Sequence, residues 1–312
     1  MPQPKLRARR RTVRLRRSEL STPGSNERMI QKAASSSADL VFLDLEDAVA
    51  PPEKISARRK VVDAIRELDW GLKTVGVRVN ALGTEWGYDD LVEVVTGAGE
   101  RLDVLILPKV KAAEDVRWVD WLLDQLERKS GRKRPVGLEV LIEEVEAIIN
   151  VEAIAFSSRR LEALIFGPGD FSASQQIRHA LAREYPGDPW HYTRNRIVIA
   201  ARTAGLDAID GPYADFRNPE GYRTECLRAS YLGFDGKWAI HPSQVDIANE
   251  VFSPTAEEVE QARRVVGAYE EAQAAGLGAV AIDGRMIDAA SVRIARNILA
   301  KAELIERLRR PG

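Results

Sequence analysis

Short apolar runs recur eight times along this chain of 312 residues, and stretches with helical spacing of apolar residues separate them. Such alternation is typical of repeated strand–helix units around a parallel sheet. One intervening helix is expected at residues 114–129, where apolar residues recur every three or four positions. The expected strands are residues 16–23, 39–46, 74–80, 104–110, 136–143, 162–170, 207–213 and 236–242.

Eight strands and eight helices predict an α/β fold, a closed (β/α)8 TIM barrel with a C-terminal helical extension. Eight is the number that closes such a barrel, and no GxGxxG turn follows the first expected strand, as an open dinucleotide-binding sheet would require. We therefore assign residues 1–250 to the barrel, including a basic N-terminal arm. Residues 251–312 are expected to form a separate C-terminal helical segment.

The charges nearly cancel, with 46 Lys and Arg residues against 47 Asp and Glu residues. This balance favours neither nucleic-acid nor membrane binding. No apolar run approaches the length of a membrane span or a signal-peptide core, and we expect a cytoplasmic protein. The single cysteine, Cys226, cannot form a disulfide within the chain and is expected to be a buried, inert thiol.

The N-terminal arm departs from this balance, because residues 7–17 (RARRRTVRLRR) contain no acidic residue. Three interpretations remain open for it. It is a solvated arm, a segment that contacts a phosphate-bearing ligand, or an organellar transit peptide, whose composition is rich in arginine and poor in acids.

Polar side chains end seven of the eight expected strands. In a (β/α)8 barrel the chemistry lies at the carboxyl ends of the strands, so these side chains are expected to converge. For His241, before Pro242, we favour a capping or packing role over catalysis. The polar residues are Glu46 and Asp47, Arg78 and Asn80, Lys109, Glu143, Asp170, Asp210 and Tyr213, and His241.

Carboxylates dominate this set, whereas cysteine is absent from it and histidine is scarce. Hard oxygen ligands of this kind suit Mg2+ or Mn2+ better than zinc. Glu143 and Asp170 are the predicted direct ligands, because each follows an apolar strand that would fix it rigidly. Glu46 and Asp47 are predicted to hold the waters of the metal ion.

Arg78 lies among Val75, Val77 and Val79 in an apolar strand, where a cation needs an anionic partner. We expect it to stabilise an oxyanion or an enolate that forms during a reaction. The alternative is a salt bridge to the neighbouring carboxylates with no catalytic part.

Eight stretches, in order along nearly the whole chain, resemble the HpcH/HpaI aldolase and citrate lyase β-subunit family, most closely its malyl-CoA lyase branch. They are STPGSNERMIQKA (21–33), VFLDLEDAV (41–49), RVN (78–80), LPKV (107–110), LIE (141–143), FGPGDFSAS (166–174), GKWAIHPSQV (236–245) and GRMIDAASVRIARNILAKA (284–302).

The resemblance implies a Mg2+-dependent acyl-CoA lyase that catalyses reversible Claisen cleavage of a 3-hydroxyacyl-CoA such as malyl-CoA into glyoxylate, a 2-oxo acid, and acetyl-CoA. It places the metal ligands on Glu143 and Asp170, the essential arginine on Arg78 and a catalytic acid on Asp288. It also implies a homotrimer or homohexamer, in which the C-terminal segment completes the active site of a neighbouring subunit.

Coenzyme A carries several phosphate charges, and five basic residues are predicted to contact them. Citramalyl-CoA or citryl-CoA lyase activity remains an alternative, as does a citrate lyase β-like subunit of a complex. A hydroxy-aldehyde aldolase is a weaker alternative, because none of the three histidines is obviously placed for catalysis. The stretch 172–196 is either a lid over the substrate or an insertion that packs on the barrel. The five basic residues are Arg16, Arg17, Lys32, Lys54 and Arg58.

Overall fold

The computed structural model of this protein describes residues 13–181 and 187–309. The chain divides into two compact units, one ending at Asn249 and the other beginning at Glu250. Residues 1–12 lie outside the described part, so the three interpretations of the N-terminal arm stay predictions there. Among the described residues, no helix combines the length and the apolar content needed to cross a membrane.

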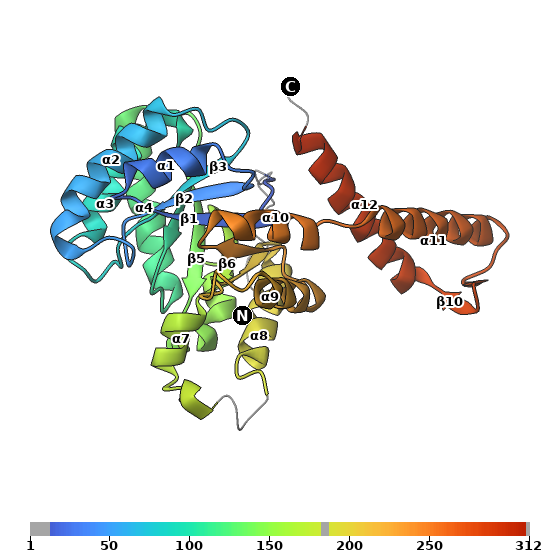
Figure 1. Cartoon of the computed structure of the whole chain (residues 1–312). Coiled ribbons are helices and arrows are strands. Elements are labelled where there is room, and N and C mark those ends of the chain that lie inside the picture. The colour runs from blue at the N-terminus through green and yellow to red at the C-terminus, as the bar shows by residue number, and fades with distance from the viewer. Residues whose placement is uncertain (1–12, 182–186, 310–312) are drawn as a thin grey trace, which may run out of the picture. The chain divides into compact units, whose positions relative to one another are not determined.

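The first unit is a closed barrel of parallel strands, as the sequence predicted (Figure 1). Each strand pairs with the next along the chain, and β1 pairs with β8 to close the ring. The strands are β1 (Ser18–Pro23), β2 (Leu40–Asp44), β3 (Thr74–Arg78), β4 (Val104–Leu107), β5 (Gly137–Ile142), β6 (Leu161–Phe166), β7 (Asp207–Asp210) and β8 (Gly236–Ala239).

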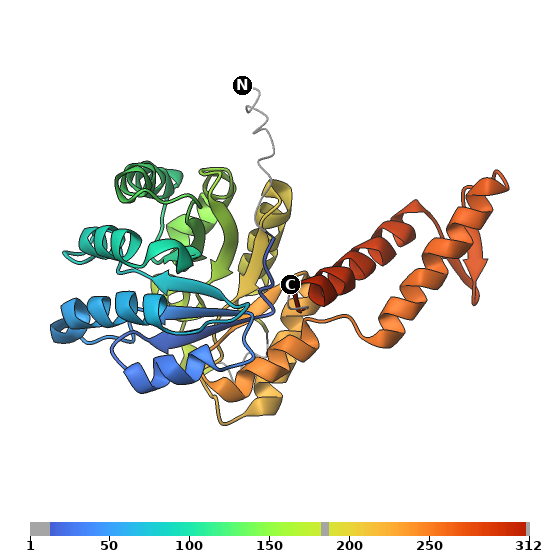
Figure 2. The same ribbon diagram turned by 90° about the horizontal axis from the view of Figure 1, so that it is seen from above.

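The strands are buried on both faces, which explains why they read as nearly continuous apolar runs. Inside the barrel, side chains from six strands form one cluster, and the rings of Phe42 and Trp238 lie 4.5 Å apart within it. Outside, helices cover the strands, as the view in Figure 2 shows. This packing holds the carboxyl ends of the strands as a rigid rim.

The covering helices alternate with the strands, and the helix expected at 114–129 is confirmed as α4. Cys226 is buried in α9, and burial raises the pKa of its thiol to about 12, which agrees with an inert thiol. The helices are α1 (Glu27–Ala34), α2 (Lys54–Glu67), α3 (Gly87–Gly97), α4 (Ala113–Ser130), α5 (Val145–Ile149), α6 (Val151–Ala155), α7 (Pro168–Ser174), α8 (His191–Ala204), α9 (Pro219–Leu232) and α10 (Pro242–Val251).

The stretch 172–196 is partly helical. It contains the end of α7, the 3-10 helix η3 (His179–Leu181) and the start of α8, while residues 182–186 are outside the described part. Trp190 ties this stretch to the barrel, because its Nε1 donates a hydrogen bond to Ser172 Oγ at 3.1 Å. Whether the stretch closes over a substrate stays a prediction.

Ion pairs occupy the amino-terminal ends of the strands. Arg16 is buried and donates to Glu139 and Asp207 at 2.8 Å each, and also to Glu162. Arg17 pairs with Asp39 at 2.6 Å just before β2. The prediction that Arg16 and Arg17 contact CoA phosphates is therefore wrong, because both guanidinium groups are buried at the end of the barrel opposite the carboxyl ends of the strands.

The second unit is a helical hairpin, α11 (Ala256–Ala274) and α12 (Ala289–Arg309), joined by the small antiparallel pair β9 (Val280–Ile282) and β10 (Arg285–Ile287). Thr255 and Glu258 form a capping box that begins α11. Gly284 takes a positive φ of 77° in the β9–β10 turn, a conformation that glycine adopts readily. The hairpin core contains Ala262, Val265, Tyr269, Ile287, Val292 and Ala295.

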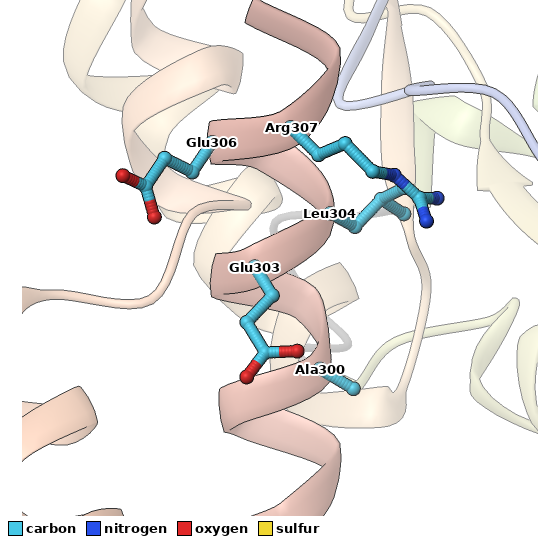
Figure 3. Close-up of a pocket in the computed structure, with 5 residues that line it drawn as sticks. All are labelled: Ala300, Glu303, Leu304, Glu306 and Arg307. Carbon is cyan, nitrogen blue, oxygen red and sulfur yellow. The ribbon is translucent and has the colours of Figure 1, made fainter.

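A surface pocket lies along the last turns of α12 (Figure 3). Glu306 projects to the left of the helix and Glu303 lies across its front, while Ala300, Leu304 and Arg307 lie on the right. The pocket is thus lined by side chains of a single helix, and none of the predicted site residues is among them.

Candidate active site at the carboxyl ends of the strands

Asp44 and Arg78 stand opposite each other at the ends of β2 and β3. Arg78 Nε donates to Asp44 Oδ1 at 2.7 Å, and Arg78 Nη2 donates to Asp44 Oδ2 at 2.6 Å. Asp44 is fully buried and also accepts hydrogen bonds from the backbone N–H groups of Glu46 and Ala48. This two-pronged pairing fixes the plane of the guanidinium group.

The remaining nitrogen of the guanidinium group faces the carboxylates after β2. Arg78 Nη1 lies 3.0 Å from Glu46 Oε2 and 3.5 Å from Asp47 Oδ2. Burial acts to lower the pKa of Arg78, but the charge and hydrogen bonds of Asp44, and then the charges of Glu46 and Asp47, outweigh it and raise the pKa above its usual value. Arg78 thus stays a cation, held at the rim with Glu46 and Asp47 beside it.

Lys109 links the carboxylates from the end of β4. Its Nζ donates to Glu46 Oε1 at 2.8 Å. The same atom lies 3.8 Å from Asp47 Oδ1 and 3.8 Å from Asp170 Oδ1. Its backbone N–H donates to Glu143 Oε1 at 2.8 Å. The sequence motif LPKV contains this lysine, but the sequence prediction assigned it no role.

Glu143 and Asp170, the two predicted metal ligands, come close enough to influence each other. Burial first, and then the charges of Glu46 and Asp170, raise the pKa of Glu143 to about 8. Asp170 lies in the first turn of α7 with a side chain that is 40% exposed. Gly167 permits this approach, since a Cβ there would lie 2.5 Å from Glu143 Cβ.

Five carboxylates and two cations therefore gather at one end of the barrel, and we call the acidic residues the carboxylate cluster. The cluster consists of Asp44, Glu46, Asp47, Glu143 and Asp170, and the cations are Arg78 and Lys109. Negative charge is in excess, and its repulsion contributes to the raised pKa of Glu143.

A divalent cation fits this donor set. Its charge would offset the excess of carboxylates, and oxygen donors suit Mg2+ or Mn2+. Mg2+ commonly binds through one or two carboxylates and keeps several waters, so Glu143 and Asp170 would be sufficient protein ligands.

Two of the basic residues predicted to bind CoA have other partners. Lys54 is buried and donates to the backbone oxygens of Leu45 and Glu46 and to Asn80 Oδ1. Arg58 is buried between Asp90 and Glu93, at 2.8 Å from each.

These internal contacts contradict a role for Lys54 and Arg58 as CoA ligands, because the charge of Lys54 holds the loops after β2 and β3 and that of Arg58 holds α3. Lys32, in the last turn of α1, is exposed, and its predicted contact with CoA stays a prediction.

Asp288 belongs to the second unit, where it directly follows β10 and begins α12. Its Oδ1 accepts hydrogen bonds from Ser291 N at 2.9 Å and Ser291 Oγ at 3.0 Å. The hydrogen bond from the backbone of Ser291, and then that from its hydroxyl group, lower the pKa of Asp288. The ionised form, which can act as a base, is therefore favoured.

Charged side chains on the rim of a (β/α)8 barrel define an enzyme whose site is suited to an anionic substrate and a hard divalent cation. A family model described as HpcH/HpaI aldolase/citrate lyase matches residues 17–242. This protein belongs to that family, as its sequence motifs predicted.

Relatives in the same family cover nearly the whole chain. The chain is 44% identical over 306 residues to an L-malyl-CoA/beta-methylmalyl-CoA lyase of Cereibacter sphaeroides. This match covers 94% of this chain and 96% of that relative. It is 39% identical over 289 residues to a (3S)-malyl-CoA thioesterase of the same organism, and this match covers 93% of this chain and 95% of that relative.

A solved structure agrees with this assignment. It is the protein CitE from Mycobacterium tuberculosis in complex with magnesium, acetoacetate and coenzyme A. The two structures superpose with a TM-score of 0.75 at 28% sequence identity, covering 92% of this chain and 97% of that one.

Proposed function

We propose that this protein is a Mg2+-dependent acyl-CoA lyase, a carbon–carbon lyase that reversibly cleaves a 3-hydroxyacyl-CoA such as malyl-CoA into glyoxylate and acetyl-CoA. The observation that carries the proposal is the fixed cation Arg78 on the same barrel rim as the pair Glu143 and Asp170, with Glu46 and Lys109 linking them. This arrangement combines a site for a metal-chelating oxo acid with a site for a developing oxyanion. The identity to a malyl-CoA lyase supports it.

Glu143 and Asp170 are the residues that would hold Mg2+ or Mn2+, with Glu46 and Asp47 accepting hydrogen bonds from metal-bound water. The bound ion would act as a Lewis acid on the oxygen of the oxo acid. The contribution of the protein itself is positional. Lys109 holds Glu46 and Glu143 in place through its side chain and its backbone, respectively.

Arg78 would stabilise the negative charge that forms when the carbon–carbon bond breaks. The electron pair of that bond passes to the acyl-CoA fragment, whose thioester oxygen gains charge as an enolate. Because Asp44 holds two nitrogens of the guanidinium group, Arg78 is oriented before the reaction begins and loses little free energy in reorganising. The hydroxyl group of the substrate loses its proton as its C–O bond becomes the carbonyl of the oxo acid. A proton must then return to the enolate carbon, so the net reaction transfers one proton from oxygen to carbon.

We assign that proton transfer to Asp288, which would remove the proton in the condensation direction. The hydrogen bonds from Ser291 keep Asp288 ionised and so able to accept a proton, although they lower its pKa and make it a weaker base. Asp288 belongs to the second unit, and we propose that this unit completes the site of a neighbouring subunit in a homotrimer or homohexamer. A cytoplasmic location is proposed on the basis of the buried free thiol of Cys226.

A substrate panel tests the proposed activity. Malyl-, β-methylmalyl-, citramalyl- and citryl-CoA are each incubated with the purified protein, in Mg2+ and in EDTA, and both the oxo acid and free thiol are measured. Lyase activity yields an oxo acid without free thiol, and only in Mg2+.

The panel also separates the alternatives. Free thiol as the main product would instead indicate a thioesterase, the activity named for one of the relatives. Preference for citramalyl- or citryl-CoA would assign a different lyase. Failure to cleave any free CoA ester would favour a β-like subunit of a complex.

Subunit mixing tests the shared site. Asp288→Asn and Arg78→Ala are each expected to be inactive. When equal amounts of the two variants exchange subunits in a head-to-tail ring, some sites combine an intact Arg78 with a neighbour's intact Asp288. These hybrid sites should be active and should make up about a quarter of all sites. Inactive hybrids of confirmed mixed composition would refute the shared site.

A further inference from the structure

Lys109 has an unusual backbone for its residue type. Its φ is 52°, in the left-handed region that side-chain-bearing residues seldom adopt. Such a conformation persists only where the surroundings hold it in place. Here the hydrogen bonds from its backbone to Glu143 and from its Nζ to Glu46 provide that hold.

In this conformation Lys109 lies close to four of the acidic residues predicted at the site. The backbone N–H reaches Glu143 Oε1, and the ammonium group donates to Glu46 Oε1, both at 2.8 Å. Asp47 and Asp170 each lie 3.8 Å from Nζ, beyond hydrogen-bonding distance. Lys109 is thus anchored to Glu46 and attracted electrostatically to Asp170.

The other cation of the site has a different partner. Two nitrogens of Arg78 are taken by Asp44, and the third faces Glu46 and Asp47. Among the described residues, Lys109 is therefore the cation whose charge lies next to Asp170. A divalent ion on Asp170 and Glu143 would meet that charge at short range.

We propose that Lys109 is a positioning residue and the resident counter-ion of the metal-binding carboxylates. Its ammonium group partly neutralises Asp170 and Glu46 before a divalent ion binds, while its N–H orients Glu143. The lysine therefore stabilises the metal-free site and weakens metal binding. This inference rests on the proposed metal site.

Binding of Mn2+ to the full-length protein, followed by electron paramagnetic resonance of the free ion, tests the inference. Lys109→Met should bind Mn2+ about tenfold more tightly, because repulsion between the ammonium group and the ion is removed. Lys109→Asn removes the same charge and tolerates the left-handed backbone, so it serves if the methionine variant fails to fold. Lys109→Arg, which keeps the charge, should remain close to wild type.

Lys111→Met is the matched control, because Lys111 lies two residues away and pairs with Glu146 at the surface. Its Mn2+ affinity should be unchanged. In EDTA, Lys109→Met should also unfold at a lower temperature than wild type, because buried Glu46 loses its ammonium partner.

Equal or weaker Mn2+ binding by both charge-removing variants would overturn the inference about Lys109. Glu143→Gln distinguishes that result from failure of the metal site. If Glu143→Gln loses Mn2+ binding while Lys109→Met is unchanged, only the lysine inference fails. If wild type shows no saturable binding, or Glu143→Gln binds normally, the proposed metal site fails and the role of Lys109 fails with it.

Discussion

Asp44→Asn tests whether the buried pair of Asp44 and Arg78 orients the guanidinium group. The substitution keeps the size of the side chain but removes its charge and turns one acceptor into a donor. Whichever oxygen is replaced, that donor would face two other donors, either Arg78 Nε and the N–H of Glu46 or Arg78 Nη2 and the N–H of Ala48. Two buried hydrogen bonds, one from Arg78 and one from the backbone, would therefore be lost.

The expected cost follows from burial and from the partners that remain. Removing one partner of a buried ion pair destabilises a protein by about 3–5 kcal/mol. Glu46 and Asp47 still lie 3.0 and 3.5 Å from Arg78 Nη1, so the cost should fall at the lower end, about 3 kcal/mol. In a barrel of this size that corresponds to a fall of roughly 6–12 °C in melting temperature.

Calorimetry measures the stability, and steady-state kinetics with malyl-CoA measures the catalytic effect. A guanidinium group that loses its fixed plane should lower kcat by roughly 100-fold. Asp47→Asn is the matched control, since Asp47 faces the same guanidinium group but is 56% exposed and should contribute about 1 kcal/mol or less. If the two variants have equal melting temperatures, the buried pair does not have the role described here.

Three further predictions concern charge in the barrel. Mg2+ binding measured by calorimetry should strengthen from pH 6 to pH 8.5, because burial raises the pKa of Glu143 to about 8 and its proton must leave first; binding that ignores pH would remove Glu143 from the ligand set. Glu19→Gln should raise the melting temperature more at pH 8 than at pH 5. Burial, and then the charge of Glu139, raise the pKa of Glu19 in the folded protein. The contribution of Glu19 to stability is therefore complete below the pKa of Glu19 in the unfolded chain and is lost as the pH rises through its pKa in the folded protein. Equal changes of melting temperature at both pH values would contradict this. Arg78→Lys should lower kcat far more than it raises KM, because lysine lacks the planar fork that Asp44 holds; a change confined to KM would make Arg78 a binding residue.

The sequence by itself determined the barrel. Strands and helices have different apolar periods, and eight alternating segments leave few other topologies. It also identified the acids and cations at the strand ends, since residues just beyond an apolar strand in a parallel barrel share one rim. Glu46, Arg78, Lys109 and Glu143 were all identified in this way.

Only the tertiary structure decided which charges are available to a ligand. Arg16 looked like a ligand contact because it belongs to a basic run, yet its partner Glu139 is 123 residues away in the sequence. Likewise, the hydrogen bonds between Asp44 and Arg78 depend on the register of β2 and β3. The contacts of Lys109 with Glu46 and Glu143 depend on its left-handed backbone conformation. Side-chain periodicity reports burial but not pairing, because the partner of a buried charge is set by how distant segments pack.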